Sequence, residues 1–484
     1  MSKILLSNLA NLQNENTAVT TINSNFSTIQ TAMDNTLSRD GTLPNQMSSN
    51  LDMNSNRVIN LPYPVTNEEP LRFGDFKQFT ITPTIGATAY DINWTQPATG
   101  GTTHSIGNVL QRTFDVRDFG AVCNGVANDT VAIQNCINAA QAAGTDSIVL
   151  LHGNSFINAA LNITSPVTIK GAGKSNTFLT SNNHAASIIN FNPSSQNCSV
   201  QLIGFGAYYT SLPSGTSVPG IAFGNSSFLN TDCIIYDVAV VNAGIGIYML
   251  NSFANRILHC NITGYWQAGI RINSPLLPDG GTCWIQSCFI NNGLANPINY
   301  NVWWNNGGGI ILTGNFFGNV GANASIGIFF DYTLATSEIR VSNNLFFGHS
   351  QGVTFQRQPG LYMYEVIITD NIFDSCPTAI YVPAEGGTPP AWFQMLIITG
   401  NGFQGRFGSI GPLISIAGVQ GSTISGNTFL SNVGGGGLTC IQTISNCADF
   451  KIGPNARTVQ INPAGSTLAA DSIAGTNMTI VGGG

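Results

Sequence analysis

Charged side chains are scarce in this sequence. Lys and Arg together number 16 and Asp and Glu 23 among 484 residues, so that 8% of the chain is charged, against roughly 25% in an average soluble domain. The formal net charge is −7, and no cluster of Lys or Arg occurs, so we expect no electrostatic binding to nucleic acid or anionic lipid. Hydrophobic residues make up 43% of the chain, which is too many for a disordered protein.

Long hydrophobic runs are absent as well. The N-terminal "MSKILLSNLANLQNENT" has too short an apolar run for a secretory signal peptide, and no run of about 20 apolar residues occurs. We therefore expect no membrane insertion. The ten cysteines include no Cys-x-x-Cys pair, so we interpret them as buried free thiols made in a reducing cytoplasm, with disulfides or metal binding as the alternative. We expect neither a metal nor a cofactor.

An internal repeat is present in the second half of the chain. Asn-x-Phe recurs at Asn315, Asn344, Asn371, Asn401 and Asn427, with spacings of 29, 27, 30 and 26 residues. "SCF" at Ser287 extends the series by one unit of 28 residues. Repeats of this length with short strands and Gly/Asn turns are typical of the coils of a parallel β-helix, and the Leu framework of leucine-rich repeats is missing. We predict an all-β, right-handed parallel β-helix in which the asparagines stack along a turn and bond neighbouring rungs.

The strand before each Asn alternates between inward and outward side chains. The positions five and three residues before the Asn are mostly apolar and predict the core, together with the Phe that follows. The position two residues before is a column of hydroxyl side chains. The position four residues before predicts an outer stripe of Ile311, Arg340, Ile367, Ile397 and Thr423. Because exposed apolar stripes usually mark interfaces, we expect this stripe to lie between the subunits of a homotrimer.

The N-terminal segment contains a heptad pattern. Leu12, Val19, Phe26 and Met33 recur every seven residues, and Ile22, Ile29 and Thr36 fill the second position of the seam. This pattern predicts a coiled coil of about three heptads, which "SRDGTLPN" at 38–45 ends with Gly and Pro. An amphipathic helix packed on its own chain is the alternative.

The segment "FDVRDFGAVCNGVANDTVAIQNCINAAQAAG" (114–144) resembles the opening of the pectate-lyase superfamily, in which Asp118-Phe119-Gly120-Ala121, Gly125 and Asp129-Thr130 match and Asn124 departs from the usual Asp. The resemblance implies a parallel β-helix over about 114–450. A helix at about 129–143, capped by Asn128 or Asp129, is expected to cover the open end of the solenoid.

The chemistry of that superfamily is weakly marked in this sequence. A pectate lyase needs acidic calcium ligands and a basic residue, and polygalacturonases carry an Asp-rich set; neither pattern is present. "GHS" at 348–350 is the one faint echo of the Gly-His-Gly of polygalacturonases.

The Asn-rich stretch "NLDMNSNRVINLPYPVTNEEPLRFGDF" (50–76) belongs to a region, residues 1–76, that resembles the attachment region of bacteriophage tail fibres and tailspikes. The resemblance implies docking to phage tail proteins, a location on the virion tail after assembly in the host cytoplasm, and a trimer. Residues 77–113 are predicted to form a neck and residues 451–484 a C-terminal β cap.

Acidic residues gather in one part of the charge-poor body. Glu338 and Glu365 take the same outward position on adjacent predicted rungs, which lie about 4.8 Å apart. We predict them as catalytic acid and nucleophile or base, with Asp331 as a helper, because glycosidases need two carboxylates about 5–9.5 Å apart. One alternative is a surface salt-bridge cluster of the two glutamates with Arg340 and Arg357, without catalysis. A bound cation is a third interpretation.

Aromatic residues lie in or beside the predicted loops between rungs. We expect them, with Arg340 and Arg357, to bind sugar rings, although core packing explains each one as well: Trp303, Trp304, Tyr362, Tyr364 and Trp392. The resulting hypothesis is a homotrimeric phage tailspike or tail fibre that binds host surface polysaccharide. An active depolymerase, either glycoside hydrolase or lyase, and a structural adaptor of the tail are the two alternatives.

Overall fold

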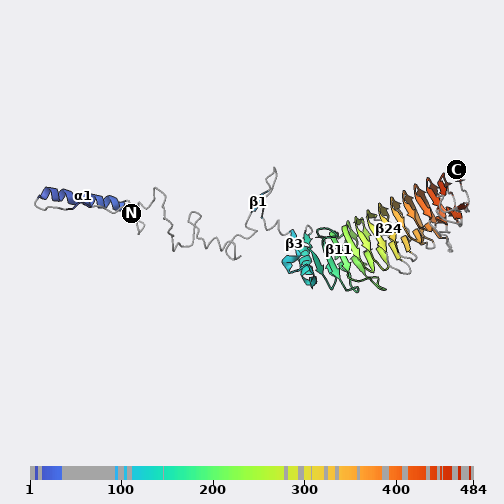
Figure 1. The fold of residues 1–484 in the computed structure, drawn as a ribbon, viewed down its shortest axis with the longest axis horizontal. Helices are drawn as coiled ribbons and strands as arrows, with labels where there is room; N and C mark the ends of the chain where they lie inside the picture. The colour runs from blue at the N-terminus through green and yellow to red at the C-terminus, as the bar shows by residue number, and fades with distance from the viewer. Residues whose placement is uncertain are drawn as a thin grey trace. The chain divides into compact units, whose positions relative to one another are not determined.

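The structure is a computed structural model (Figure 1). It describes residues 6–8, 14–34, 93–95, 103–105, 112–144, 147–276, 282–292, 299–306, 308–320, 325–332, 337–356, 360–383, 392–405, 412–431, 437–443, 447, 449, 451–459, 467–469 and 479–480. Its contacts divide the chain into two compact units, Met1–Thr88 and Ala89–Gly484. Most of the predicted neck and C-terminal cap lies outside the described residues.

Three columns of parallel strands build the second unit, which confirms the predicted all-β parallel solenoid. The strands of the first face are β3 (Thr113–Asp115), β5 (Ile148–Leu150), β8 (Val167–Lys170), β11 (Val200–Tyr209), β14 (Ile234–Val241), β17 (Arg256–Leu258), β20 (Cys283–Gln286), β23 (Ile310–Thr313), β26 (Ile339–Ser342), β29 (Tyr362–Thr369), β32 (Trp392–Thr399), β36 (Thr423–Ser425), β40 (Lys451–Ile452) and β43 (Thr479–Ile480). β35 (Val419–Gln420) also pairs with β32.

The second face follows a sharp turn after the first. The long strands β11 and β14 run through both faces, and the other strands of the second face are β4 (Asn124–Asn128), β6 (Asn154–Phe156), β9 (Phe178–Ser181), β18 (Asn261–Thr263), β21 (Phe289–Asn292), β24 (Phe316–Asn319), β27 (Leu345–Phe347), β30 (Ile372–Asp374), β33 (Gly402–Gly405), β37 (Thr428–Ser431) and β41 (Ala456–Val459).

The third face is an 11-stranded sheet. In chain order its strands are β7 (Leu161–Ile163), β10 (Ile189–Phe191), β12 (Pro219–Phe223), β15 (Ile245–Leu250), β19 (Ala268–Asn273), β22 (Asn299–Asn306), β25 (Ser325–Asp331), β28 (Gln351–Gln356), β31 (Thr378–Tyr381), β34 (Ile414–Ile416) and β39 (Ile441–Thr443). Three small two-stranded sheets stand apart: the antiparallel pair β1 (Asn93–Thr95) and β2 (Thr103–Ser105), and the parallel pairs β13 (Asn230–Thr231) with β16 (Ser252–Phe253) and β38 (Gly437–Thr439) with β42 (Thr467–Ala469).

The core lies between the three faces. In β23 the side chains of Ile310 and Leu312 are buried, whereas Ile311 and Thr313 are partly exposed, as the alternation in the sequence predicts. Phenylalanines of successive rungs stack inside, with ring centroids 4.6–5.1 Å apart: Phe317, Phe346, Phe373, Phe403 and Phe429. Nine of the ten cysteines are buried, and all ten are free thiols.

A ladder of buried asparagines runs along the turn between the first and second faces. Each Nδ2 donates to the Oδ1 of the next asparagine at 2.9–3.1 Å, through Asn315, Asn344, Asn371, Asn401, Asn427 and Asn455. The predicted stacking is thus confirmed, with one correction. Cys288, and not Ser287, takes the ladder position in the preceding rung, because Phe289 pairs with Phe316.

The residue before each ladder asparagine turns the chain sharply. Its φ is positive before the first five of the six asparagines, with values of 66° at Gly314, 70° at Gly400 and 66° at Gly426; Pro454 precedes the last, Asn455. Glycine adopts this left-handed conformation without a steric penalty, and Asn343 and Asp370, at 54° and 56°, belong to the residue types that tolerate it best.

Helix α4 (Thr130–Ala143) packs on β3, β5 and β7, at the first rungs of the solenoid. Its buried face comprises Ile133, Cys136, Ile137 and Ala140. The carboxylate of Asp129 makes no capping bond and instead accepts the N–H groups of Val122 and Cys123 at 2.7 and 2.9 Å. Asn128 Oδ1 accepts from the hydroxyl and N–H of Thr130, so Asn128 holds the start of the helix. A short 3-10 helix, η1 (Val116–Phe119), precedes this region.

Helix α1 (Glu15–Asp34) forms the described part of the first unit together with residues 6–8. Its predicted seam is exposed: Val19, Phe26 and Met33 are 49%, 64% and 65% accessible. The chain covers another side of the helix, where Asn25 exchanges two hydrogen bonds with the backbone of Ser7 at 2.9 and 3.0 Å. Leu12 and Thr36 of the seam lie outside the described residues.

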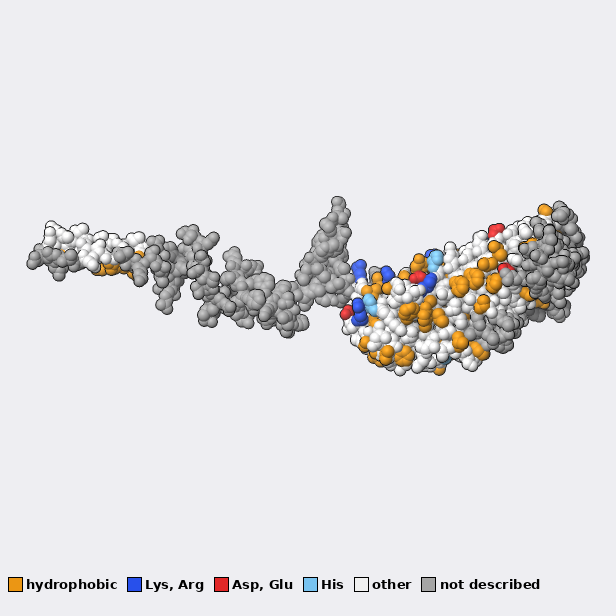
Figure 2. Space-filling view, in the orientation of Figure 1, with side chains coloured by type: hydrophobic (Ala, Val, Ile, Leu, Met, Phe, Trp, Pro, Cys, Tyr) orange, Lys and Arg blue, Asp and Glu red, His pale blue; other side chains and the backbone are white. Residues whose placement is uncertain are grey.

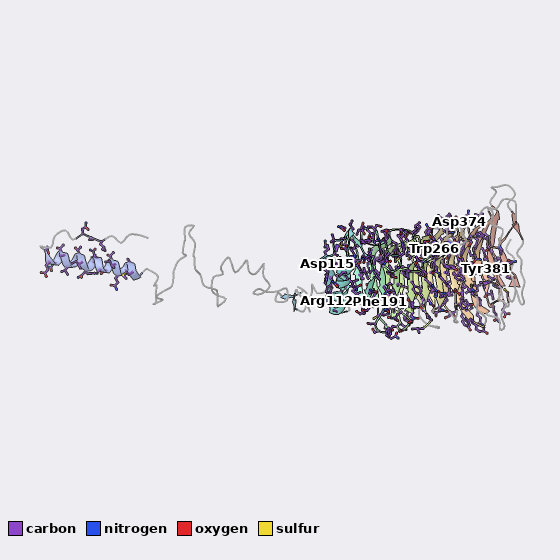
Figure 3. All side chains as sticks on the ribbon, turned by 90° about the horizontal axis from the view of Figure 1, so that it is seen from below. Arg112, Asp115, Phe191, Trp266, Asp374 and Tyr381 are labelled. Atoms are coloured by element: carbon purple, nitrogen blue, oxygen red, sulfur yellow. The ribbon has the colours of Figure 1, made fainter. Side chains whose placement is uncertain are left out.

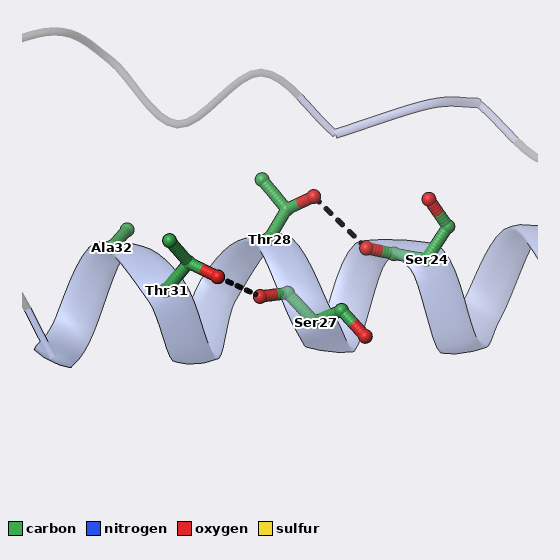
Figure 4. A pocket seen from close by; sticks show the side chains of 5 residues that line it. All are labelled: Ser24, Ser27, Thr28, Thr31 and Ala32. Atoms are coloured by element: carbon green, nitrogen blue, oxygen red, sulfur yellow. Dashed lines mark hydrogen bonds between the residues drawn. The ribbon is translucent and has the colours of Figure 1, made fainter.

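A shallow groove on α1 is lined by small and hydroxyl side chains, namely Ser24, Ser27, Thr28, Thr31 and Ala32 (Figure 4). Thr28 and Thr31 turn their hydroxyls back to the carbonyls of Ser24 and Ser27 at 2.9 Å, so these groups are satisfied within the helix. Within the described residues, no helix is long and apolar enough to cross a membrane.

Candidate functional site on the third face

The predicted carboxylate pair lies on the first face. Ile339 pairs with Val366, so Glu338 and Glu365, one residue earlier in each chain segment, belong to adjacent rungs. Both side chains are exposed. Glu338 Oε2 accepts a hydrogen bond from Thr282 Oγ1 at 3.4 Å. Two exposed carboxylates therefore occupy neighbouring rungs, as the repeat predicts.

Neither the backbone conformation nor the described ion pairs mark Glu338 and Glu365 as catalytic residues. Glu338 and Glu365 have positive φ values of 61° and 53°, but Met395 in the next rung has 61°, so the conformation belongs to the solenoid turn and is no sign of a strained catalytic group. Arg340 is exposed in the outer stripe, and no ion pair joins it to either glutamate among the residues that the structure describes. Arg357, the other predicted partner, lies outside the described residues.

Asp331, the predicted helper, belongs to the third face. It ends β25, and its Oδ2 accepts from Trp303 Nε1 at 3.4 Å and from Asn305 Nδ2 at 3.1 Å. Its described contacts are thus with the neighbouring rung of the third face and with neither glutamate. The structure brings together Asp331 and Trp303, which the sequence indicated for separate roles.

The other predicted aromatics fall into three groups. Trp304 is 1% exposed and packs edge-on against Phe330, with ring centroids 5.8 Å apart, so it is a core residue and its prediction as a sugar-binding ring is wrong. Tyr362 and Tyr364 stack at 6.1 Å on β29, and Tyr364 is 37% exposed. The side chain of Trp392 lies outside the described residues.

One outward column of the third face is unusually rich in π-systems. Register aligns Tyr248, Arg271, Trp303 and Phe329 on four consecutive rungs, each partly exposed. Thr354 and Tyr381 continue the column, and Figure 3 labels Tyr381 toward the C-terminal end of the solenoid. Parallel in-register pairing thus assembles residues from distant parts of the sequence into one row.

Arg271 is held between two aromatic rings of this column. Its Cζ lies 3.9 Å from the ring centroid of Trp303 and 5.5 Å from that of Tyr248. Its Nε donates to Asn305 Oδ1 at 2.8 Å. Cation–π contact and this hydrogen bond together fix the plane of the guanidinium group.

Asn305 owes its position to a β-bulge. The pairing of β19 with β22 matches Ile272 to Trp304 and Asn273 to Asn306, so Asn305 is an extra residue in β22. Bulges commonly redirect a side chain next to functional sites. Here the amide of Asn305 joins Arg271 on one side to Asp331 on the other.

Tyr300 completes the cluster. Its ring stacks on Phe329 with centroids 4.9 Å apart and lies 5.1 Å from Trp303. Burial raises the pKa of Tyr300, and the nearby negative charge of Asp331 raises it further. We name the following set the third-face network: Tyr248, Arg271, Tyr300, Trp303, Asn305, Phe329 and Asp331.

Charge is rare enough elsewhere to make this arrangement distinctive. Figure 2 shows apolar patches over the visible side of the second unit and only a few small groups of charged side chains. Two ion-paired clusters occupy earlier rungs: Asp115 with Arg117 and His152 at 2.7 and 2.9 Å, and Lys174 with Asp237 at 2.9 Å. Within the described residues, Arg271 and Asp331 have no ion-pair partner, and no group of acidic, His and Cys side chains is placed to hold a metal ion.

His349, from the polygalacturonase-like tripeptide, is a core residue. It is 1% exposed, and its Nε2 lies 3.1 Å from the carbonyl of Phe317 and its Nδ1 3.0 Å from Ser325 Oγ. Burial lowers its pKa to about 4. The faint resemblance at 348–350 therefore has a structural explanation.

Sequence reasoning missed most of the third-face network, although a signal for it exists. In the four strands β15, β19, β22 and β25, a small or polar residue is followed by a branched apolar residue and then by the outward residue of the column. The triplets are Gly-Ile-Tyr248, Gly-Ile-Arg271, Asn-Val-Trp303 and Gly-Ile-Phe329. Aligning these triplets would have shown the column.

Residues 113–211 match the model of a family described as rhamnogalacturonase A/epimerase, pectate lyase-like. The chain therefore contains a pectate-lyase-like β-helix domain, which confirms that part of the sequence interpretation. Over 73 residues the chain is 41% identical to mannuronan C5-epimerase AlgE3 of Azotobacter vinelandii; this segment is 14% of the chain, and the chain spans only 4% of the epimerase.

Solved structures with a similar fold include a DFA-IIIase from Arthrobacter chlorophenolicus A6. It has 14% sequence identity and a TM-score of 0.53, over 75% of this chain and 100% of that chain. The Dettilon tailspike protein has 19% identity and a TM-score of 0.48, over 78% of this chain and 68% of that chain. At such identities the likeness concerns the fold alone, and the resemblance of residues 1–76 to phage tail proteins stays a prediction.

Proposed function

We propose that the third-face network binds a saccharide. The observation that carries this proposal is the pair of opposite charges, Arg271 and Asp331, each bonded to Asn305 and neither paired with an ion among the described residues. Guanidinium, amide and carboxylate groups supply the donors and acceptors that sugar hydroxyls require. The partly exposed aromatic rings beside them supply apolar contact.

The wider proposal is that this protein is a homotrimeric tailspike or tail fibre of a bacteriophage, that residues 1–76 attach it to phage tail proteins on the virion, and that the solenoid meets host surface polysaccharide. The exposed seam of α1 supports association, because an apolar seam with heptad spacing is covered by further copies of the same helix. The saccharide proposal above supports the host-facing role.

The outer surface of the solenoid offers a second reason to propose a homotrimer. Ile311, Arg340, Ile367 and Ile397 align on the first face as predicted. Across the asparagine turn, a second apolar stripe runs along the second face. It consists of Phe289, Phe316, Leu345 and Ile372, of which Phe289 and Ile372 are 41% and 56% exposed. Stripes of this kind are typical of protein interfaces.

A polysaccharide depolymerase is the second candidate function. It is favoured by Glu338 and Glu365, two exposed acidic residues whose rungs are about 4.8 Å apart along the solenoid. Side chains on adjacent rungs can bring two carboxyl groups to the roughly 5–9.5 Å that glycosidases use. If the two glutamates are catalytic, the third-face network binds the polysaccharide at a distance from the bond that is cleaved.

Saccharide binding is tested on a printed array of bacterial surface polysaccharides. We expect the full-length protein to be retained by at least one polysaccharide and Asn305→Ala to lose that retention, because Arg271 and Asp331 are then no longer bridged. Trp284→Ala is the matched control: it removes a partly exposed aromatic ring from the first face and should bind normally. Retention by no polysaccharide would contradict the proposal and favour the structural adaptor of the tail.

Attachment is tested by deleting residues 1–76 from the protein encoded by a producing phage. We expect the truncated protein to fold and assemble but to be missing from purified particles. Particles that carry normal amounts of the truncated protein would contradict an attachment role for this region.

A further inference from the structure

We propose that the saccharide bound by the third-face network carries a carboxylate and that Arg271 binds that group. This inference rests on the proposed saccharide binding and adds the chemical class of the ligand. It starts from the orientation of the guanidinium group. Arg271 is sandwiched between Tyr248 and Trp303, and its only described hydrogen bond comes from Nε to Asn305.

The two terminal nitrogens of Arg271 therefore keep their donors for a ligand. A guanidinium group with a fixed plane and an unused Nη edge matches the two oxygens of a carboxylate, which it binds through two parallel hydrogen bonds. Stacking on aromatic rings removes part of the water around the cation, which strengthens its attraction for an anion. A neutral hydroxyl uses neither the planar fork nor the charge to the same extent.

Asp331 does not cancel this preference. Arg271, Asn305 and Asp331 lie on three successive rungs of the third face, and the Asn305 amide stands between the two charges, bonded to Nε at 2.8 Å and to Oδ2 at 3.1 Å, so Arg271 and Asp331 form no direct ion pair. On the other side of Arg271 the column continues through Tyr248 to Ala222 and carries no charge. A carboxylate at Arg271 can therefore approach from the uncharged side, while Asp331 accepts bonds from sugar hydroxyls two rungs away.

The structure also contains a matched control for Arg271. Arg256 lies over Trp284 on the first face, with its Cζ 5.4 Å from the ring centroid. It is exposed and shares the cation–π contact, but no asparagine bridge to a carboxylate is found for it among the described residues. Replacing either arginine by glutamine removes one positive charge, and only one of the two changes affects the proposed site.

The test compares each polysaccharide retained on the array with the same polysaccharide after chemical reduction of its carboxyl groups, and with sulfated neutral polysaccharides. We expect retention only for polysaccharides with carboxylates and loss of it after reduction. In calorimetry, Arg271→Gln should weaken binding of the acidic form roughly 10- to 100-fold, the range for a hydrogen bond to a charged group. Arg256→Gln should leave affinity unchanged, and circular dichroism should show both variants folded.

Other outcomes separate the two proposals. Retention of the reduced form at full strength, or an Arg271→Gln variant that binds acidic and reduced forms in the wild-type ratio, would overturn the carboxylate inference while saccharide binding stands. Equal retention of sulfated neutral polysaccharides would show a general anion site and overturn it as well. Retention of nothing would overturn the proposed function, and the inference with it.

Discussion

Asn371 lies in the middle of the buried ladder, and replacing it by alanine tests what the ladder contributes to stability. Its Nδ2 donates to the carbonyl of Val341 at 2.8 Å and to Asn401 Oδ1 at 3.0 Å. Its Oδ1 accepts from the N–H and Nδ2 of Asn344, both at 3.0 Å. One side chain thus makes four hydrogen bonds that join three rungs.

The cost of Asn371→Ala follows from what is left without a partner. Asn344 Nδ2 still donates to Leu312, and Asn401 Oδ1 still accepts from the N–H of residue 371. The N–H of Asn344 loses its acceptor, at about 1–3 kcal/mol for a buried donor, and three further hydrogen bonds of about 1 kcal/mol each are removed. We expect the free energy of unfolding to fall by about 4–6 kcal/mol.

Guanidinium unfolding followed by circular dichroism measures this loss, and limited proteolysis shows whether the rung opens locally. Asn182→Ala is the control, since Asn182 is exposed and no hydrogen bond of its side chain is found among the described residues, so that the change is worth about 0.5 kcal/mol or less. If Asn371→Ala and the control had the same unfolding midpoint, the ladder would add no net stability and the reasoning would be refuted.

The fold and the proposals carry three more predictions. Burial lowers the pKa of His349 from 6.5 to about 4, so the imidazole of the unfolded chain is protonated at a higher pH than that of the folded chain. The free energy of unfolding should therefore fall by about 3 kcal/mol as the pH drops from about 6.5 to 4. His349→Gln should remove this pH dependence in unfolding experiments. Ile367→Asp, which puts a charge into the proposed interface, should convert a trimer to smaller species by light scattering at a cost of several kcal/mol per subunit; a monomeric wild type would contradict the trimer. If the protein cleaves polysaccharide, Glu338→Gln and Glu365→Gln should each slow chain shortening by about 10²–10⁴-fold in size-exclusion chromatography, and wild-type rates in both would place the site elsewhere.

The second half of the fold could be predicted from sequence because its ladder is chemically uniform. Each rung from 315 onward needs an amide side chain at the same place, so the requirement appears in the sequence as a repeated Asn. The earlier rungs fill the same position with Phe205, Val238, Cys260 and Cys288, which pack or donate a weak S–H bond, and no one residue type is common to all four. These rungs obey the same geometry but leave no repeat to count, and the family-like opening was the only guide there.

The site was harder to predict than the fold because it depends on pairing across rungs. In "VWW" the two tryptophans are adjacent, and only the pairing of Trp303 with Arg271 and Phe329 shows that Trp303 faces out and Trp304 faces in. Counting from the ladder asparagines fixes faces on the first face, which is why the rung-to-rung neighbourhood of Glu338 and Glu365 was correct. The same count does not assign side chains on the third face, because loops of unequal length separate that face from the ladder. A bulge in β22 also shifts the alternation of inward and outward side chains. That bulge turns Asn305 outward between Arg271 and Asp331. Asn305 joins the network together, yet a strict alternation of inward and outward side chains does not predict its orientation.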